Sequence, residues 1–315
     1  MSVLAVLHLV TSASAQSYPD RPVKILVTNP AGGTADLFAR IVSRGLQARL
    51  NQPFVVENRP GAAGLIATEA VARAKPDGYT LLVTNENSIT ILPAIRSDIP
   101  YDPATAFTPI RTLGALPFFL VANASLGVNS VSDVIKLART RGNKLNYGST
   151  GEGGASHLLT ERFSSAAGIS MVHIPYKGGP DAMASLIAGE TDLFFSIPTT
   201  ALGQLSNSRL KFLAMTGARR SEKAPDVPTL TEQGIRNFEV NSWFGLLGPA
   251  GMPPGTLSAI SRGVAEVTAD PATRAIISGQ GAEVVDDTPA EFSIKIQDDL
   301  AAWKKTATAL GLNLK

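Results

Sequence analysis

Short apolar strands alternate with amphipathic helices along this chain of 315 residues, and this alternation most constrains its fold. In the first part, strands are predicted over 23–28, 54–57 and 80–84, with helices over 36–50 and 62–74 between them. Strand–helix–strand repeats of this kind give parallel strands joined by right-handed crossovers. The chain is therefore predicted to be an α/β protein.

A second series of strands and helices follows a stretch that is rich in proline. Residues 85–116 contain four prolines and are expected to form loops and short edge pieces. The second series begins with a strand at 118–122. Near the C-terminus, a strand at 241–247 precedes two helices, at 256–268 and 289–310. This tail has too few strands to form a domain, so we expect it to return to the first one.

The predicted architecture is two doubly wound α/β lobes with two crossing segments between them, near 117–124 and 238–246. Residues 18–120 together with 241–315 would form lobe 1, and residues 121–240 would form lobe 2. The length agrees with this division, because domains average ~150 residues. Lobe 1 is thus expected to be built from both ends of the chain.

The composition excludes several kinds of chemistry. The chain has no cysteine, which excludes disulfides, thiolate zinc sites and a cysteine nucleophile. Its three histidines are too few for a histidine-rich metal centre, so no metal or cofactor is expected. With 28 Lys and Arg against 26 Asp and Glu, the net charge is +2, which gives no electrostatic footprint for nucleic acid. Backbone, hydroxyl and amide groups remain as the expected means of binding.

An apolar run near the N-terminus favours export. Residues 3–10 are followed by Ala13 and Ala15, which form the A-x-A pattern of a signal-peptidase site. Residues 1–15 are interpreted as a signal peptide that is truncated, because no Lys or Arg precedes the apolar run. The alternative is that 3–10 form an ordinary buried strand. No later segment reaches the ~20 apolar residues that span a bilayer, so a soluble periplasmic protein is expected.

Two glycine-rich turns each join the end of a strand to the start of a helix, and they are the candidate binding loops. Ligands of open α/β sheets bind at the carboxyl ends of the strands, where helix N-termini suit a carboxylate or phosphate. Thr34 is predicted to cap the first helix. The alternative is that the glycines only make tight turns. The candidate residues are Ala31, Gly32, Gly33, Thr34 and Asp36 in the first turn, and Ser149, Thr150, Gly153, Gly154, Ala155, Ser156 and His157 in the second.

Enzymatic interpretations of the second turn are weak. It lacks the dinucleotide-binding G-x-G-x-x-G pattern and the G-x-S-x-G elbow of hydrolases. A hydrolase using Ser149 or Ser156 would need a base and an orienting acid within hydrogen-bond reach. It would be excluded if His157 and His173 lay more than ~4 Å from every serine of the cleft. A capping or hinge role is favoured for His157, and no enzymatic activity is expected.

A third strand-to-helix turn lies at 173–181. Tyr176 and Lys177 could reach into a cleft between the lobes from this turn. The alternative is a surface turn that Pro175 and Pro180 stiffen.

A series of short motifs in a fixed order is similar to one known family. The motifs are YPDRPV at 18–23, PAGGTAD at 30–36, VVENRPGAAG at 55–64, AKPDGYTLL at 74–82, PYDP at 100–103, the turn at 149–157, HIPYKG at 173–178, PDVPT at 225–229 and WFGL at 243–246. Over nearly its whole length the chain resembles the Bug-type solute receptors of tripartite tricarboxylate transporters.

The resemblance implies a periplasmic two-lobed Venus flytrap of the type II binding-protein architecture. Such a receptor captures a small carboxylate between its lobes and delivers it to the membrane permease subunits of the transporter. By the same resemblance, the two candidate loops hold the ligand and Asn85, Ser88, Tyr176 and Lys177 line the cleft. No cofactor and no nucleic-acid partner are expected from the composition and charge, and we expect a monomer.

Two departures from the family pattern leave the ligand open. This chain has Thr-Asn-Pro-Ala at 28–31 where the family usually carries an aromatic residue and often a second proline. It also has Gly154 and Ala155 where a serine usually precedes the histidine. Two alternatives to transport remain. A periplasmic sensor for a two-component system would share the same site, and a serine-dependent hydrolase is less favoured.

Overall fold

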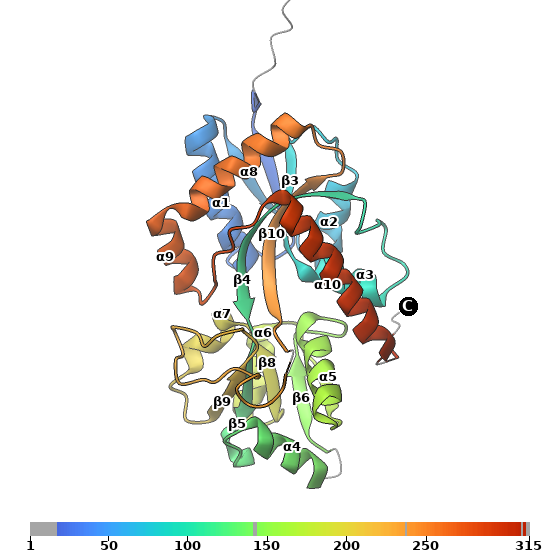
Figure 1. The fold of residues 1–315 in the computed structure, drawn as a ribbon, viewed down its shortest axis with the longest axis vertical. Helices are drawn as coiled ribbons and strands as arrows, with labels where there is room; N and C mark the ends of the chain where they lie inside the picture. The colour runs from blue at the N-terminus through green and yellow to red at the C-terminus, as the bar shows by residue number, and fades with distance from the viewer. Residues whose placement is uncertain (1–17, 141–143, 237, 310, 313–315) are drawn as a thin grey trace, which may run out of the picture.

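The structure, a computed structural model, has two lobes stacked along its long axis (Figure 1). It describes residues 18–140, 144–236, 238–309 and 311–312, so the predicted signal peptide lies outside it. Each lobe contains its own five-stranded sheet with helices packed around it. The predicted α/β class with two lobes is confirmed. Of the helices in the described ranges, none is long and apolar enough to cross a membrane.

The sheet of lobe 1 has the strand order β2-β1-β3-β10-β4. Strand β1 is parallel to β2 and β3, as the strand–helix–strand repeat predicts. Strand β10 is antiparallel to β3 and β4, and it brings the C-terminal part of the chain back to lobe 1. The strands are β1 (Val23–Val27), β2 (Phe54–Asn58), β3 (Thr80–Asn85), β4 (Phe107–Pro117) and β10 (Asn241–Pro249).

The sheet of lobe 2 has the order β7-β6-β8-β5-β9. Strand β6 is parallel to β7 and β8, and β5 is antiparallel to β8 and β9. The strands are β5 (Phe119–Asn123), β6 (Asn146–Ser149), β7 (Val172–Pro175), β8 (Leu193–Ser196) and β9 (Leu210–Met215). The chain crosses between the lobes from β4 to β5 and again just before β10, so both predicted crossing segments are confirmed. The lobe boundaries themselves stay a prediction.

Helices surround both sheets. Around the lobe 1 sheet lie α1 (Thr34–Leu50), η1 (Ala62–Gly64), α2 (Leu65–Ala72), the π-helical turn η2 (Asn87–Ile91), α3 (Leu92–Ile95), α8 (Pro254–Ala269), α9 (Pro271–Gly279) and α10 (Pro289–Ala309). Around the lobe 2 sheet lie η3 (Ala124–Leu126), α4 (Val131–Thr140), α5 (Ala155–Ala167), α6 (Gly179–Ala188), α7 (Pro198–Ala201) and η4 (Leu202–Gln204).

The largest error of the sequence-based prediction concerns residues 85–116. The sequence predicts loops and short edge pieces here, but the last ten residues of the segment belong to the eleven-residue strand β4 (Phe107–Pro117). Pro109 is tolerated because β4 lies at the edge of its sheet, where a missing N–H breaks no ladder. Pairing with β10 also shifts register between Leu246 and Leu247, opposite Pro109. Proline therefore indicated an edge strand here and not a loop.

Smaller errors concern helix boundaries. The predicted cap Thr34 is the first residue of α1, and Gly33 occupies the cap position. The helix predicted over 62–74 is interrupted at Gly64, whose φ is +97°, and only Leu65–Ala72 is α-helical. Helix α9 was not predicted at all. It has nine residues, which is shorter than the stretch over which apolar periodicity indicates a helix.

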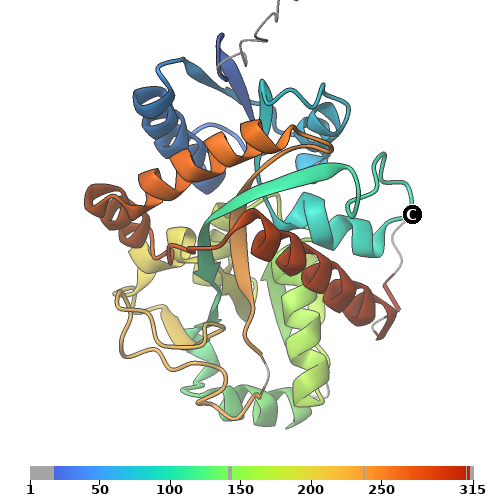
Figure 2. The ribbon, with the colours of Figure 1, turned by 45° about the horizontal axis from the view of Figure 1, so that its top comes forward.

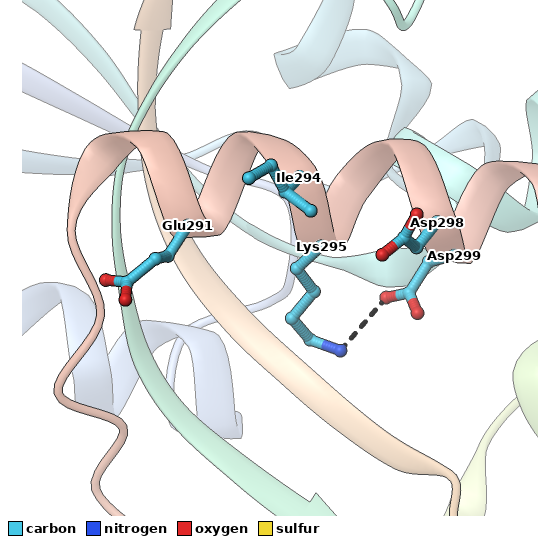
Figure 3. A pocket seen from close by; sticks show the side chains of 5 residues that line it. All are labelled: Glu291, Ile294, Lys295, Asp298 and Asp299. Carbon is cyan, nitrogen blue, oxygen red and sulfur yellow. Dashed lines mark ion pairs between the residues drawn. The ribbon is translucent and has the colours of Figure 1, made fainter.

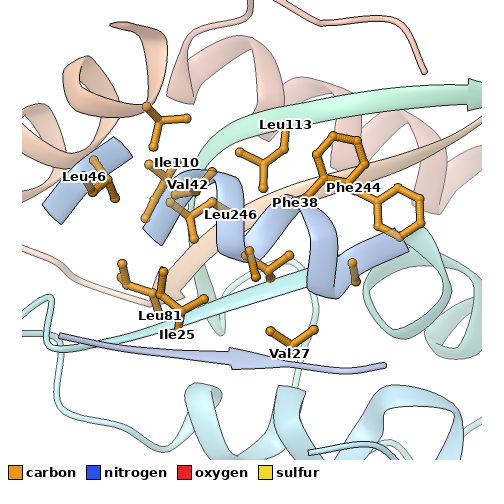
Figure 4. Close-up of a cluster of buried hydrophobic side chains, with 14 of the residues drawn as sticks. Ile25, Val27, Phe38, Val42, Leu46, Leu81, Ile110, Leu113, Phe244 and Leu246 are labelled. Atoms are coloured by element: carbon orange, nitrogen blue, oxygen red, sulfur yellow. The ribbon is translucent and has the colours of Figure 1, made fainter. Parts of the chain in front are cut away.

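The core of lobe 1 lies between α1, α8 and one face of the sheet. Figure 4 shows Phe38 of α1 beside Phe244 of β10, and their ring centroids are 5.4 Å apart. Leu46, farther along α1, is fully buried in the same cluster. On the other face of the sheet, α2 and α10 cover a second cluster that includes Trp243. Both faces of the sheet are thus buried, which holds the ends of its strands in fixed positions.

Helix α10 connects the two lobes on one side of the molecule. It runs along lobe 1 and its C-terminal half reaches α5 of lobe 2 (Figure 2). There Trp303 of α10 shares an apolar cluster with Leu158 of α5 and Ile91 of η2. The N-terminus of α5 is therefore held close to lobe 1.

Candidate functional site

The first candidate loop, loop 1 (Ala31–Asp36), joins β1 to the start of α1. Gly32 has a φ of +83°, which only glycine adopts readily, and Gly33 then caps α1 in an extended conformation. Because glycine has no side chain, the first N–H groups of α1 have no capping side chain from it. The Asp36 Oδ2 atom reaches back and accepts a hydrogen bond of 2.9 Å from the Gly32 N–H.

The second candidate loop, loop 2 (Thr150–His157), joins β6 to the start of α5 in lobe 2. Gly153 has a φ of +69°, and Gly154 caps α5 in an extended conformation without a side-chain hydrogen bond. The His157 Nδ1 atom accepts a hydrogen bond of 3.0 Å from the Gly153 N–H. The Ser156 hydroxyl accepts a further bond of 2.9 Å from the Thr150 N–H, which closes the start of the loop.

The two loops have the same local structure. Residues 32–36 correspond to 153–157, and the two cap glycines have φ and ψ of −78° and 171° in loop 1 and −78° and 166° in loop 2. In both loops the side chain of the third helical residue accepts a hydrogen bond from the N–H of the glycine that precedes the cap. Each lobe therefore presents an uncapped helix N-terminus, a geometry that binds anions.

Both loops lie where the lobes meet. The Thr34 hydroxyl of loop 1 donates to the Thr199 hydroxyl of lobe 2, with 3.3 Å between the oxygens. On the same side, a Cβ at Gly281 of lobe 1 would be only 2.6 Å from Pro198. Ala155 of loop 2 packs next to the cluster that α10 and α5 share. Each of the two loops that the sequence singled out thus has a residue in contact with the other lobe.

Asp36, which accepts the hydrogen bond from the Gly32 N–H of loop 1, is charged. Asp36 is buried, and its Oδ2 atom forms an ion pair of 2.9 Å with Arg40 Nε. Burial opposes ionisation of Asp36, but hydrogen bonds from Arg40 and from the Gly32 N–H outweigh it and lower the pKa of the carboxyl. Asp36 is therefore ionised at neutral pH.

His157, which accepts the hydrogen bond from the Gly153 N–H of loop 2, is neutral. Burial lowers the pKa of His157, whose imidazole stacks on that of His173 with centroids 3.8 Å apart and an angle of 7°. Burial and the neighbouring His157 lower the pKa of His173 to about 4. The Tyr147 ring also packs against His173, with centroids 5.1 Å apart, and its hydroxyl bonds to Glu161. Both imidazoles are thus uncharged at neutral pH.

A serine and a histidine do lie within hydrogen-bond reach. Ser149 Oγ is 2.6 Å from His173 Nε2, so distance alone does not exclude a hydrolase. Ser149 is fully buried, however, and its hydroxyl also bonds to the N–H and C=O of Gly151. A nucleophile must reach its substrate, so this serine has a structural environment and not a catalytic one.

The predicted site residues divide by exposure. Ten are at least partly exposed: Ala31, Gly32, Gly33, Thr34, Asn85, Thr150, Gly154, Ala155, Tyr176 and Lys177. Six are buried: Asp36, Ser88, Ser149, Gly153, Ser156 and His157. The Ser88 hydroxyl bonds to Thr68 and Thr84 inside lobe 1, and that of Tyr176 bonds to Ser185 inside lobe 2. Which of the sixteen touch a ligand stays a prediction.

A polar cavity of about 240 Å³ lies at the crossing segments, and the sequence did not indicate it. Its lining includes Glu86 at the end of β3, Asn241 at the start of β10, and Ala155 of loop 2. One carboxyl oxygen of Glu86 accepts a hydrogen bond of 2.9 Å from the Ser242 hydroxyl. The other carboxyl oxygen has no hydrogen-bond partner among the described residues. Burial raises the pKa of Glu86 to about 7.

A larger hollow of about 360 Å³ lies on the surface of α10 (Figure 3). All five residues that line it belong to this helix, and Lys295 pairs with Asp299 at 3.2 Å within it. No predicted site residue lines it, and it is not shared between the lobes. In the part of the chain that the structure describes, no cluster of three acidic or histidine side chains could hold a metal ion.

The sequence reasoning missed the residues that support the loops. The residues that were not identified are Arg40, Tyr147 and Glu86. The hydrogen bond between His173 and Ser149 was not foreseen either. One signal was available: Gly-Gly-x-x-Asp at 32–36 and Gly-Gly-x-x-His at 153–157 have the same spacing. The two copies would have indicated that Asp36 and His157 play the same part.

Comparison with known proteins places the chain in a family. Residues 38–312 match the model of the tripartite tricarboxylate transporter family receptor. The Bordetella pertussis protein BugT is 32 % identical over 99 % of this chain and 96 % of its own length.

Solved structures are similar in fold and sequence. The R. palustris protein Rpa4515, determined with adipate, is 31 % identical and superimposes with a TM-score of 0.84 over 94 % of this chain and 99 % of its own. MatC from Rhodopseudomonas palustris, determined with bound malate, is 26 % identical with a TM-score of 0.80 over 92 % and 99 % of the two chains. The family model is that of a transporter receptor, and a further similar structure is the periplasmic binding protein BugD, in agreement with the expectation that the chain is not an enzyme. Since the family model covers most of the chain and BugT matches nearly all of it, the chain belongs to the tripartite tricarboxylate transporter receptor family, whose members are Bug-type periplasmic solute-binding receptors.

Proposed function

We propose that this protein captures a small carboxylate between loop 1 and loop 2 and delivers it to a membrane permease of the tripartite tricarboxylate type. The observation that carries this proposal is the pair of equivalent loops, one from each lobe, whose helices begin at glycine caps. Two proteins of similar fold were determined with carboxylates, adipate and malate, which supports the ligand class.

The binding energy would come from backbone N–H groups. The N-terminus of a helix carries about half a positive charge, and its first N–H groups point along the axis toward an anion. A carboxylate accepts such bonds in a charge-assisted form that is roughly twice as strong as a neutral one. The glycines at 32–33 and 153–154 let the ligand approach the backbone closely.

Capture would couple to closure of the lobes. A ligand that bonds to both loops interacts fully only when the lobes are together, so it stabilises the closed arrangement over the open one. The two crossing segments, between β4 and β5 and before β10, are the places where backbone rotation would open the lobes. Release at the permease then requires only that these segments reopen.

The setting of this function is part of the proposal. We infer that the protein acts in the periplasm as a monomer, exported by its N-terminal segment, because its family consists of periplasmic solute receptors. The permease subunits are its proposed partners. No cofactor enters the proposed mechanism, because hydrogen bonds alone account for reversible capture.

A ligand screen tests the proposal. We expect at least one di- or tricarboxylate, aromatic acid or amino acid to raise the melting temperature and to bind with measurable heat in calorimetry. A screen in which no such compound stabilises the protein would overturn it. To separate transport from sensing, the loaded protein is immobilised and offered detergent-solubilised permease subunits or a sensor kinase. Capture of the permease supports transport, whereas capture of the kinase alone supports sensing.

A further inference from the structure

The two loops have the same backbone shape but fix it with different hydrogen-bond acceptors. The glycine before each cap has a positive φ, and its N–H points back to the third residue of the helix. In loop 1 this acceptor is the Asp36 carboxylate, and in loop 2 it is the His157 Nδ1 atom. A carboxylate accepts hydrogen bonds at any pH above its pKa, whereas an imidazole nitrogen accepts only when it carries no proton.

The Gly153 N–H depends on this acceptor. Gly153 is buried, whereas its counterpart Gly32 is exposed to water. A buried N–H that loses its acceptor has no water to replace it, so the loop must move to satisfy the group. Protonation of Nδ1 would turn the acceptor into a second donor and set two donors against each other. Loop 2 is therefore the more sensitive of the two loops.

The surroundings of His157 keep its imidazole neutral. His173 of β7 stacks on it, and His173 in turn bonds to Ser149 at the start of the loop. The other titratable groups near the stacked imidazoles are Tyr147 of β6, Glu161 of α5 and Glu152 of the loop. Helix α10 faces α5 through Trp303 in an apolar cluster. The two imidazoles cannot both be protonated without placing two positive charges 3.8 Å apart.

We propose that His157 is a positioning residue, which holds loop 2 in its anion-binding shape through the Gly153 N–H and releases it when the imidazole is protonated. This inference rests on the proposed function, since it assigns a role in carboxylate capture. It makes the affinity for a carboxylate fall in acid through lobe 2 and not through lobe 1. The residue acts through the backbone and does not itself touch the ligand.

The test compares the wild type with His157→Asn. Asparagine has the length of Asp36, which already makes the same contact in loop 1, and it does not titrate. Hydrogen exchange of the Gly153 amide is measured in the ligand-free protein from pH 7.5 to pH 4 and corrected for intrinsic rates. The Ile169 amide, bonded to the Ser164 carbonyl at the other end of α5, reports on general loosening.

In the wild type we expect protection of Gly153 to fall about tenfold with acid, while that of Ile169 stays constant. In His157→Asn the Gly153 protection should be independent of pH. Adipate and malate affinities, measured by calorimetry over the same range, should fall in both proteins as the ligands themselves take up protons, but they should fall further in the wild type. Equal pH dependence of Gly153 protection in both proteins would overturn the inference. Absence of binding to any carboxylate at any pH would instead overturn the proposed function, since the exchange data stand without a ligand.

Discussion

Loop 1 and loop 2 share a backbone but differ in the charges that support it. In loop 1, Asp36 is followed one turn later by Arg40, and the two side chains form an ion pair. In loop 2, the corresponding residues are His157 and Glu161, and Glu161 bonds instead to the Tyr147 hydroxyl. An acidic residue followed by a basic one thus supports loop 1. A neutral residue followed by an acidic one supports loop 2. The shape depends on the paired glycines and on an acceptor three residues after the cap.

The lobes also differ in how they respond to acid. Lobe 1 buries Glu86, whose carboxyl has a raised pKa, and lobe 2 buries two imidazoles with lowered pKa values. Lowering the pH therefore favours the folded state through the carboxyl of Glu86 in lobe 1. It disfavours the folded state through the two imidazoles in lobe 2. The four predictions that follow test the comparison between the two loops and their lobes.

The largest effect is expected from a carboxylate placed at the start of α5. Ala155→Asp would put a negative charge beside the N–H groups of loop 2, where we expect it to repel the ligand by about 4 kcal/mol, a loss of roughly a thousandfold in affinity. Aspartate at the first helical position favours the helix dipole, and the melting temperature of the variant checks that it folds. Calorimetry with the carboxylate found in the screen measures the loss.

Ala155→Asn is the matched control, because asparagine has the same size without the charge. It should weaken binding far less than Ala155→Asp. Equal losses in the two variants would show that bulk and not charge is excluded from loop 2. An unchanged affinity in Ala155→Asp would place the ligand away from this loop, and the comparison between the loops would lose its functional meaning.

The second effect concerns Glu86 and the pH dependence of stability. Its pKa is about 7 in the folded protein against an ordinary value of 4.5, so the folded state binds the proton more tightly. Glu86 therefore stabilises the fold below pH 4.5, and this contribution is lost as the pH rises through about 7, by up to about 3 kcal/mol. In Glu86→Gln this part of the pH dependence should disappear.

Urea unfolding between pH 5 and pH 8 measures this effect. The wild type should lose stability relative to Glu86→Gln as the pH rises. The imidazoles act in the opposite sense, since their lowered pKa values favour stability above pH 6.5 and reduce it as the pH falls toward 4. If the difference between the two proteins does not change with pH, the carboxyl of Glu86 is not the group that titrates.

The third effect compares the two acceptors directly. His157→Ala leaves the buried Gly153 N–H without a partner and should destabilise the fold by about 2 kcal/mol. Asp36→Ala should cost less, about 1 kcal/mol, because Gly32 is exposed and water can replace the carboxylate. Urea midpoints at pH 7 measure both. A larger cost for Asp36→Ala would mean that the ion pair with Arg40 matters more than the glycine contact.

The sequence predicted the positions of the loops because those positions depend on local chemistry. Glycine pairs after a strand and before an amphipathic helix are short-range patterns, and they located both 31–36 and 149–157. The parallel part of each sheet followed from the same local alternation. Strand β4 was missed because its prolines look like loop residues until the edge position of the strand is known.

The supporting contacts were not predictable because they join distant residues. Ser149 meets His173 across 24 residues, and Thr34 meets Thr199 across 165. Glu86 looks like an ordinary polar residue at the end of a strand until β10 returns from the C-terminal part of the chain and buries it. Periodicity reports the face that a residue occupies within its own element. It does not report what the other lobe brings to that face.

The smallest effect isolates the contact between the lobes. Thr34→Val removes the hydroxyl that meets Thr199, and one such hydrogen bond contributes about 0.5–1 kcal/mol, or roughly two- to fivefold in affinity. Thr199→Val should cost the same, and the double variant should cost no more than either single one, because all three lose the same bond. Additive losses, measured by calorimetry, would mean that Thr34 bonds to the ligand and not to lobe 2. Loop 1 would then bind the ligand through this side chain as well as through its backbone N–H groups, and the Thr34 hydroxyl would add nothing to the contact between the lobes.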